Sequence, residues 1–286
     1  MATKISNTLA KTAVITGAGR GMGRAMALGL LRHGCAVVAI DNHAASLEDL
    51  MVLARSEGRD KMLLTLAVEL TRPEAASNIL AQSVARFHQV DILINNAGIG
   101  RDSIWTDNWK HQRSFFDVTP DQWRRFFEVN LHTHYMMLHT IVPQMIKQGW
   151  GRVVANTTSL STMLDRGSAP YGQPKAAHES MMAAMSAELP VTGVTANVLI
   201  PGGRTNTSMV SESVPVPRSK MIQPEVMVPP LLWLISDDAA DINARRIVAR
   251  RWDINLPPHE ALKLAGGPIG WSTAGSESVR PLPPAK

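Results

Sequence analysis

The stretch that decides the fold is Thr16-Gly17-Ala18-Gly19-Arg20-Gly21-Met22-Gly23. It directly follows an apolar run at 12–16 and opens an amphipathic segment at 22–33. Glycines let the backbone turn tightly, and a helix that begins here offers free N–H groups and the positive end of its dipole. A turn of this kind between a strand and a helix predicts a cradle for the phosphates of a dinucleotide.

The spacing of these glycines separates the turn from two other phosphate-binding loops. A G-x-G-x-x-G fingerprint would need a third glycine that is missing in either reading, and no G-K-S or G-K-T sequence is present. A nucleoside-triphosphate loop is therefore not expected. The pattern that is present reads T-G-x-x-x-G-x-G.

Outward from this turn, short apolar runs alternate with longer amphipathic stretches. The runs fall at 12–16, 36–40, 62–68, 91–95, 152–156 and 194–199, and the helical patterns at 22–33, 73–88, 120–148 and 171–189. Continuous apolar runs suit strands that are buried on both faces of a parallel sheet. We expect a single doubly wound, Rossmann-like α/β domain with about seven parallel strands over residues 1–256, and an irregular Pro- and Gly-rich tail over 257–286.

The composition is that of an ordinary globular protein. Of the 286 residues, 45% are hydrophobic and 19% are charged. No run of about 18 apolar residues predicts a membrane span, and the polar N-terminus lacks the apolar core of a secretory signal. The single cysteine, Cys35, excludes an intramolecular disulfide and favours a reducing compartment, so we expect a cytoplasmic protein.

Several function classes lack their sequence patterns. The chain carries a net charge of +5, and its last 46 residues hold seven Lys or Arg against four acids. Without zinc-finger spacing or an RNA-binding aromatic motif, we interpret these arginines as solvated or paired at an interface, and expect no nucleic-acid partner. The nine histidines show no zinc-site spacing, so no metal site is expected. A G-x-S-x-G elbow for a hydrolase is also missing.

Asp41, at the end of the second predicted strand, bears on the choice of cofactor. A carboxylate there can accept hydrogen bonds from the hydroxyls of the adenosine ribose and repel a 2′-phosphate, which favours NAD over NADP. Arg20 in the glycine-rich turn acts in the opposite sense, because a basic residue could bind a 2′-phosphate. We expect NAD to be preferred, with NADP as the alternative.

Tyr171 and Lys175 are four residues apart in Tyr171-Gly172-Gln173-Pro174-Lys175, so they share one face of a helix. A free tyrosine has a pKa near 10, too high for a base at neutral pH. A lysine ammonium one turn away stabilises the phenolate and lowers that pKa. The pair therefore suits proton transfer to or from a substrate oxygen while a hydride moves to or from the neighbouring carbon.

Together these motifs resemble the short-chain dehydrogenase/reductase family, over about residues 11–207 and more weakly to about 251. The resemblance implies that Tyr171 is the catalytic acid/base and that Lys175 tunes it. It also implies that Asn130 completes the catalytic set by holding a water between the lysine and solvent. The expected cofactor-binding residues are Gly17, Arg20, Gly21, Met22, Gly23, Asp41, Glu69, Leu70, Asn96, Ala97, Gly98, Tyr171, Lys175, Pro201, Gly202, Thr205 and Thr207.

The sequence departs from the family pattern at the catalytic hydroxyl. The family's serine precedes its tyrosine by 13 residues, and that position holds Thr158, followed by Ser159. Either hydroxyl could donate a hydrogen bond to the substrate oxygen. Spacing favours Thr158 and residue identity favours Ser159. In the same way, Thr205 and Thr207 both qualify as the threonine that binds the nicotinamide carboxamide.

Two further segments differ from what the family leads us to expect. The loop 100–118 is longer and contains Trp105 and Trp109. We expect it either to line or cover the substrate site or to be a surface or oligomer-contact insertion. The usual D-G-G near the final strand is replaced by Ala249-Arg250-Arg251-Trp252-Asp253. The substrate edge or the subunit edge of the molecule therefore differs from that of its relatives.

The motifs predict an enzyme that transfers a hydride reversibly between NAD(H) and a secondary alcohol or ketone, its small-molecule partner. One alternative is an NADPH-dependent carbonyl reductase, such as a 3-oxoacyl reductase. Another is a non-catalytic dinucleotide-binding sensor or scaffold. The resemblance also implies a homodimer or homotetramer formed through 120–148 and 171–189.

Overall fold

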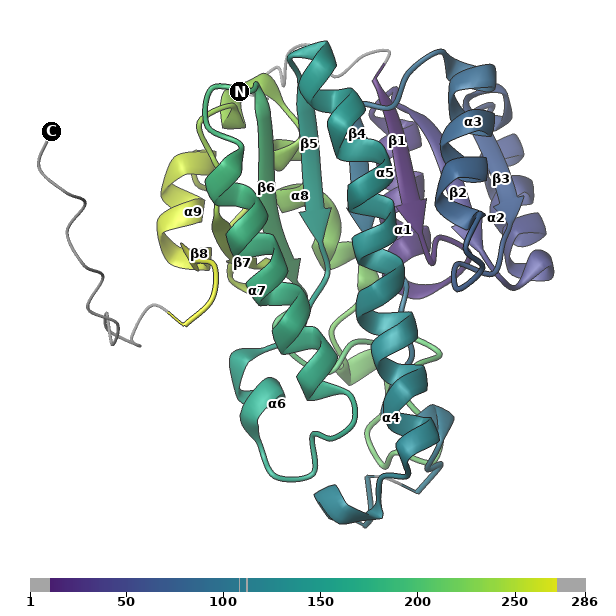
Figure 1. Ribbon diagram of the computed structural model, residues 1–286, viewed down its shortest axis with the longest axis vertical. Coiled ribbons are helices and arrows are strands. Elements are labelled where there is room, and N and C mark those ends of the chain that lie inside the picture. The colour runs from purple at the N-terminus through teal and green to yellow at the C-terminus, as the bar shows by residue number, and fades with distance from the viewer. Residues whose placement is uncertain (1–10, 108, 112, 272–286) are drawn as a thin grey trace, which may run out of the picture.

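The computed structural model describes residues 11–107, 109–111 and 113–271. Its centre is one eight-stranded sheet in the order β3-β2-β1-β4-β5-β6-β7-β8, with helices on both faces (Figure 1). The strands are β1 (Thr12–Thr16), β2 (Ala36–Asp41), β3 (Leu63–Ala67), β4 (Ile92–Asn95), β5 (Gly151–Ala155), β6 (Val194–Ile200), β7 (Arg245–Val248) and β8 (Gly266–Pro268). All neighbouring pairs are parallel except β7 and β8, which are antiparallel.

The helices form a layer on each face of the sheet. They are α1 (Gly21–Arg32), α2 (Ala44–Ser56), α3 (Ala75–Phe87), α4 (Pro120–Phe127), α5 (Thr133–Gln148), α6 (Leu160–Leu164), α7 (Gly172–Glu188), α8 (Val228–Leu234) and α9 (Pro258–Ala265). Within the described ranges, none of them combines the length and apolar character needed to cross a bilayer.

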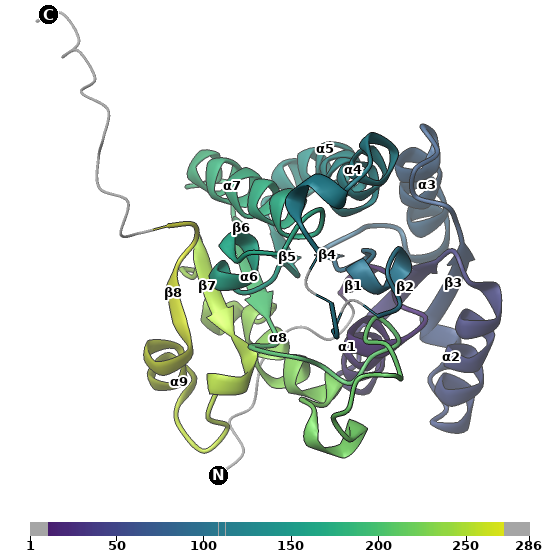
Figure 2. The ribbon, with the colours of Figure 1, turned by 90° about the horizontal axis from the view of Figure 1, so that it is seen from below.

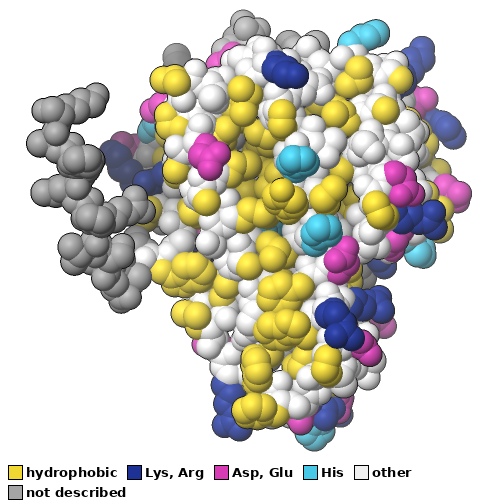
Figure 3. Space-filling view, in the orientation of Figure 1, with side chains coloured by type: hydrophobic (Ala, Val, Ile, Leu, Met, Phe, Trp, Pro, Cys, Tyr) yellow, Lys and Arg dark blue, Asp and Glu magenta, His cyan; other side chains and the backbone are white. Residues whose placement is uncertain are grey.

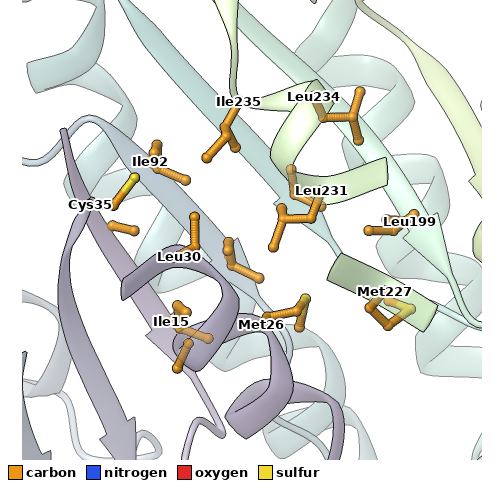
Figure 4. Close-up of a cluster of buried hydrophobic side chains, with 14 of the residues drawn as sticks. Ile15, Met26, Leu30, Cys35, Ile92, Leu199, Met227, Leu231, Leu234 and Ile235 are labelled. Carbon is orange, nitrogen blue, oxygen red and sulfur yellow. The ribbon is translucent and has the colours of Figure 1, made fainter. Parts of the chain in front are cut away.

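The core consists of two apolar clusters, one on each face, because successive strand residues point to opposite sides. In β1, Ala13 and Ile15 belong to the cluster formed with α1, α2 and α8, part of which Figure 4 shows. Val14 belongs to the cluster formed with α3, α5 and α7. Burial on both faces explains why these strands read as continuous apolar runs.

The predicted doubly wound α/β fold is confirmed, with three differences in detail. The amphipathic stretch 120–148 forms two helices, α4 and α5, joined by a π-helical turn at Glu128–His132. The helices α2, α6 and α8 were not predicted. The sheet has one more strand than expected, since β8 adds to the outer edge of β7.

The prediction of an irregular tail was wrong for residues 258–268, which form α9 and β8. The prolines that suggested irregular structure lie at the start of α9, where a missing N–H costs no helical hydrogen bond. Ala261 and Ala265 are buried and anchor the helix to the core. Residues 272–286 of the predicted tail lie outside the described residues.

The order of the strands places a crevice between β1 and β4. From β1 the chain builds β2 and β3 on one side and then crosses to β4 on the other, so the two connections leave in opposite directions. Ligands of doubly wound sheets bind at such a switch point, outside the carboxyl ends of the strands. Figure 2 looks onto these ends.

Candidate active site

The glycine-rich turn connects β1 to α1 at this crevice. A Cβ on Gly23 would lie 1.9 Å from the carbonyl oxygen of Gly17, so the turn closes only around glycine. Arg20, which precedes α1, forms no side-chain cap with the described residues, and the first turn of the helix contains no acid. The N–H groups at the start of α1 are therefore left for an anionic ligand, and the pyrophosphate of a dinucleotide fits this cradle.

Asp41 lies beneath the turn, at the end of β2. Its carboxylate accepts hydrogen bonds from the backbone N–H of Gly19 and of His43, both at 3.0 Å. The backbone thus fixes both oxygens of a side chain that is itself buried. Glu69 is nearby, since it accepts a hydrogen bond from Asn42 at 3.2 Å, whereas Leu70 packs against the apolar cluster on the α3 side.

Arg20 faces a different environment. Its side chain is exposed and lines a cavity of about 590 Å³ between α1 and the segment 206–225. Thr207 and Arg218 also line that cavity. Arg20 and Asp41 therefore differ in their burial as well as in their charge.

Asn96 links the ends of three strands. Its side-chain amide donates to the carbonyl oxygens of Thr16 and Gly17, at 3.0 and 3.1 Å, and its Oδ1 accepts from Asn156 at 3.0 Å. The amide of Asn156 also contacts the sulfur of Met22 at 3.8 Å. These bonds hold the ends of β1, β4 and β5 at fixed positions around the crevice.

Asn130 and Lys175 converge beside Gly98. A Cβ on Gly98 would lie 2.6 Å from Asn130 Oδ1 and 3.6 Å from Lys175 Nζ. Asn130 lies in the π-helical turn, and its amide exchanges hydrogen bonds of 2.9 and 3.1 Å with the backbone of Ile99. Lys175 donates to the carbonyl oxygen of Asn156 at 2.9 Å, and burial lowers its pKa to about 8. It therefore stays mainly protonated at neutral pH.

Tyr171 precedes the first residue of α7, and its hydroxyl forms a hydrogen bond with Thr158. Burial raises the pKa of the phenol above its ordinary value, although this hydrogen bond and the charge of Arg101 act to lower it. The prediction that Lys175 lowers this pKa was therefore wrong for the protein without a bound cofactor, because burial outweighs the nearby charges. The phenol is therefore protonated near neutral pH, the form that can donate a proton to a substrate oxygen.

The structure separates the two candidate hydroxyls. Ser159 caps α6: its Oγ accepts from the N–H of Thr162 at 3.1 Å and lies 2.6 Å from the hydroxyl of the same residue. Thr158 is the hydroxyl that meets Tyr171. Thr158, Tyr171 and Lys175 therefore lie together near the end of β5, whereas the hydroxyl of Ser159 is engaged in capping α6.

The two candidate threonines after β6 also lie in different surroundings. Gly202 of the Pro201-Gly202 pair has a φ of +93° and turns the chain away from the sheet. Thr205 is buried and donates to the carbonyl oxygen of Gly203 at 3.1 Å. The methyl group of Thr207 would lie 2.8 Å from a Cβ on Gly21. Thr207 is therefore the threonine that borders the phosphate cradle.

A family model described as short chain dehydrogenase matches residues 11–216. The chain belongs to this family. It is 30% identical over 195 residues to a 3-oxoacyl-(acyl-carrier-protein) reductase of Salmonella typhimurium, with 67% of this chain and 72% of that protein covered. It is 27% identical to the L-rhamnose 1-dehydrogenase (NAD(P)(+)) of a Sphingomonas species, with 83% and 94% covered.

A solved structure gives the same architecture. The 3-ketoacyl-(acyl-carrier-protein) reductase of Brucella melitensis, complexed with NADH, superposes with a TM-score of 0.71 at 23% identity, covering 82% of this chain and 94% of that one. At that identity the likeness concerns the fold alone. The predicted membership of the family is confirmed by the family model, and the protein is an oxidoreductase of the short-chain dehydrogenase type with an NAD(P)-binding fold.

In this short-chain dehydrogenase, Arg101 is a site residue that the sequence analysis missed. It lies in the loop that follows Asn95-Asn96-Ala97-Gly98 at the end of β4, and its guanidinium donates to the carbonyl oxygen of Gly167. Its charge acts on Tyr171 and lowers the pKa of the phenol. The available signal was its position, three residues after the Asn-Asn-Ala-Gly motif.

A buried ion pair between Glu179 of α7 and Arg246 of β7 lies against the backbone of Thr158, the candidate catalytic hydroxyl. The two side chains meet at 2.7 Å, with side-chain exposures of 0% and 8%. Arg246 also donates to the carbonyl oxygen of Thr158, and Glu179 accepts from the hydroxyl of Thr157 at 2.8 Å. The pair therefore fixes the backbone that presents Thr158.

The long loop 100–118 packs against the segment after β6. Asp102 accepts from the N–H of Ser211 at 2.6 Å, and the indole of Trp109 donates to Ser213 at 2.8 Å. That segment includes Thr207, which borders the glycine-rich turn. These two hydrogen bonds join the loop to the segment that borders the glycine-rich turn. That the loop lines the substrate site stays a prediction.

Two buried histidines stack near Lys175. The rings of His134 (α5) and His178 (α7) lie 4.4 Å apart at 14°, and neither side chain is exposed. Burial and the charge of Lys175 hold the pKa of both well below the ordinary value, and the backbone of Ala97 opposes this for His134. Both rings are therefore neutral in the folded protein at neutral pH.

This pair makes stability depend on pH. The unfolded chain protonates both histidines as the pH falls below about 6.5 and the folded chain does not, so each ring lowers the free energy of unfolding by about 1.4 kcal/mol per pH unit. We expect this slope between pH 6.5 and 5 to decrease in the double variant His134→Phe/His178→Phe, measured by denaturant unfolding. The exposed His139 gives the control, His139→Gln. An equal slope in the double variant would contradict a neutral pair.

Proposed function

We propose that this short-chain dehydrogenase transfers a hydride reversibly between NAD(H) and a secondary alcohol or ketone. The observation that carries the proposal is the meeting of Thr158, Tyr171 and Lys175 at the end of β5, next to a phosphate cradle at the switch point of the sheet. This set also speaks against a non-catalytic sensor, because binding a dinucleotide requires no tyrosine paired with a threonine hydroxyl.

The residues present fit the cofactor. The open N-terminus of α1 would hold the pyrophosphate and Asp41 the adenosine ribose. Lys175 would reach the nicotinamide ribose, and Thr207, which borders the turn at Gly21, would bind the nicotinamide carboxamide. When bound, the nicotinamide supplies or accepts the hydride.

The proton steps belong to the protein. The hydroxyl of Thr158 orients the substrate oxygen beside Tyr171, which donates its phenolic proton to that oxygen during reduction and takes it back during oxidation. The ammonium of Lys175 and the guanidinium of Arg101 favour the phenolate that remains. Asn130, hydrogen-bonded to Ile99, holds the π-helical turn beside Lys175, where a water could carry the proton to solvent.

The alternative within enzymes is an NADPH-dependent carbonyl reductase, and the similarity to a 3-oxoacyl reductase favours it. The fixed position of Asp41 favours NAD(H), because a carboxylate under the ribose repels a 2′-phosphate.

Cofactor titration separates the two possibilities. We expect NAD(H) to quench protein fluorescence at lower concentration than NADP(H). Asp41→Asn should weaken NAD(H) binding by roughly tenfold or more, since a hydrogen bond to a charged group is worth about 1.5–3 kcal/mol. Asp49→Ala, an exposed carboxylate on α2 that pairs with Arg24 at 3.8 Å, is the control. Tighter binding of NADP(H) by the parent chain would favour the carbonyl reductase, and no binding of either would refute the proposal.

We also propose a cytoplasmic homodimer or homotetramer. Hydrophobic side chains gather over α5 and α7 on the face shown in Figure 3. On α5, Tyr135 and Ile146 are 48% and 41% exposed. A second copy packed on this face would bury them. The single cysteine, which is buried, agrees with a reducing compartment.

A further inference from the structure

A second cavity lies beside the proposed catalytic hydroxyl, at the carboxyl ends of β6 and β7. Its volume is about 470 Å³, and Ser159, Gly202 and three arginines, Arg246, Arg250 and Arg251, line it together with aliphatic side chains. None of the described residues that line it is acidic. A concave site of this size suits part of a small organic molecule.

The three arginines differ in the charge that they can offer. Arg246 is already neutralised by Glu179 at 2.7 Å. Arg250 and Arg251 are exposed, and within the described part of the chain neither meets an acidic side chain at ion-pair distance. The cavity is therefore lined by two arginines whose charge no described acidic side chain neutralises, and a guanidinium binds carboxylate or phosphate oxygens with two parallel hydrogen bonds.

Backbone contacts hold Arg250 and Arg251 next to Pro201 and Gly202 of the candidate active site. The N–H of Arg250 donates to the carbonyl oxygen of Pro201 at 3.2 Å, and a Cβ on Gly202 would lie 3.3 Å from Arg250 Cβ. Arg250 and Arg251 occupy a single helical turn, Ala249–Arg251, whose first residue is buried. The positions of their Cα atoms thus follow from the end of β7, and not from a free loop.

On the other side, the cavity borders the backbone that presents Thr158. Ser159 lines it and directly follows Thr158, and Arg246, which also lines it, donates to the carbonyl oxygen of Thr158. A substrate whose oxygen is held by Thr158 would extend into the cavity past this backbone, and a group placed there would meet Arg250 and Arg251.

We propose that this cavity binds an anionic group of the substrate, a carboxylate or a phosphate, so that the enzyme acts on an anionic alcohol or oxo compound. That the anionic group belongs to a substrate rests on the proposed function, whereas the binding of an oxoanion in the cavity can be tested without turnover. Where the sequence shows Arg250-Arg251 in place of the family's D-G-G, the structure supplies the reason: the replacement builds the cationic wall of the cavity.

Inorganic phosphate and acetate are the probes for the site, titrated by calorimetry into protein saturated with NADH so that the phosphate cradle of the turn is filled. We expect the double variant Arg250→Gln/Arg251→Gln to bind the preferred probe at least tenfold more weakly than the parent chain. The matched control is Arg55→Gln, an exposed arginine on α2. Preference for phosphate or for acetate identifies the kind of anionic group.

Kinetics then test the link to the substrate. Hydroxy acids and their neutral amides are compared as pairs, and we expect the acid to have the higher kcat/KM in the parent chain and to lose at least tenfold of that advantage in the double variant. Equal probe affinity in parent and variant, or an acid-to-amide ratio that the variant leaves unchanged, would overturn the proposal. Failure of NADH to bind would refute the proposed function instead, while titrations without NADH would still compare phosphate binding in the two proteins.

Discussion

Tyr171→Phe is expected to lower kcat/KM for hydride transfer by about 10²- to 10⁴-fold, the usual contribution of a positioned acid or base. Phenylalanine keeps the ring that packs at the start of α7 and removes the hydroxyl that meets Thr158. The affinity for NADH should change little, because the phosphate cradle and Asp41 are untouched. Steady-state rates on a panel of alcohols and ketones, together with cofactor titration, measure both quantities.

The chain offers a matched control for this substitution. It contains two tyrosines, and the other, Tyr135, is 48% exposed on α5. Tyr135→Phe removes the same hydroxyl from a position far from the proton path and should leave kcat/KM within about twofold of the parent, as expected for a surface substitution. Parental activity in Tyr171→Phe would show that another group transfers the proton.

Glu179→Gln is expected to lower the free energy of unfolding by about 3–5 kcal/mol at pH 7. The glutamine retains the shape of the side chain, but the guanidinium of Arg246 then remains buried, with 8% of its side chain exposed, facing a neutral amide. Losing one partner of a buried pair is costly because the remaining charge has left water without compensation. Denaturant unfolding with an unchanged m-value measures the effect.

Two further variants test whether the unpaired charge of Arg246 causes the loss of stability in Glu179→Gln. Glu260 pairs with Lys263 on the exposed side of α9 at 2.7 Å, and Glu260→Gln should cost about 0–1 kcal/mol, as for other surface pairs. The double variant Glu179→Gln/Arg246→Met removes both buried charges and should recover part of the stability that Glu179→Gln loses. If the double variant were less stable than the single one, the loss would come from packing and hydrogen bonds instead of the unpaired charge.

The sequence predicted those parts of the site that lie within one turn or along one helix. The glycine spacing at residues 16–23 and the four-residue spacing of Tyr171 and Lys175 are local, and local geometry follows from residue type. The two apolar faces of the sheet were likewise readable, because burial on both sides leaves continuous apolar runs.

Features that depend on contacts between distant segments could not be predicted from the sequence. The choice between Thr158 and Ser159 depends on which hydroxyl caps α6, and this depends on the path of the chain up to Tyr171. Arg101 acquires its place through Gly167, 66 residues later in the chain. The pairing of His134 with His178 requires α5 and α7 to lie side by side. None of these leaves a periodic signal in the sequence.

The eighth strand, β8, limits how copies of this protein can associate through the edge of the sheet. An uncovered edge of a sheet offers a row of N–H and C=O groups to any strand nearby and is a route to aggregation. Here β8 covers the edge of β7, is only three residues long and ends in Pro268, which has no N–H to donate. Growth of the sheet into a neighbouring molecule is therefore disfavoured on that side.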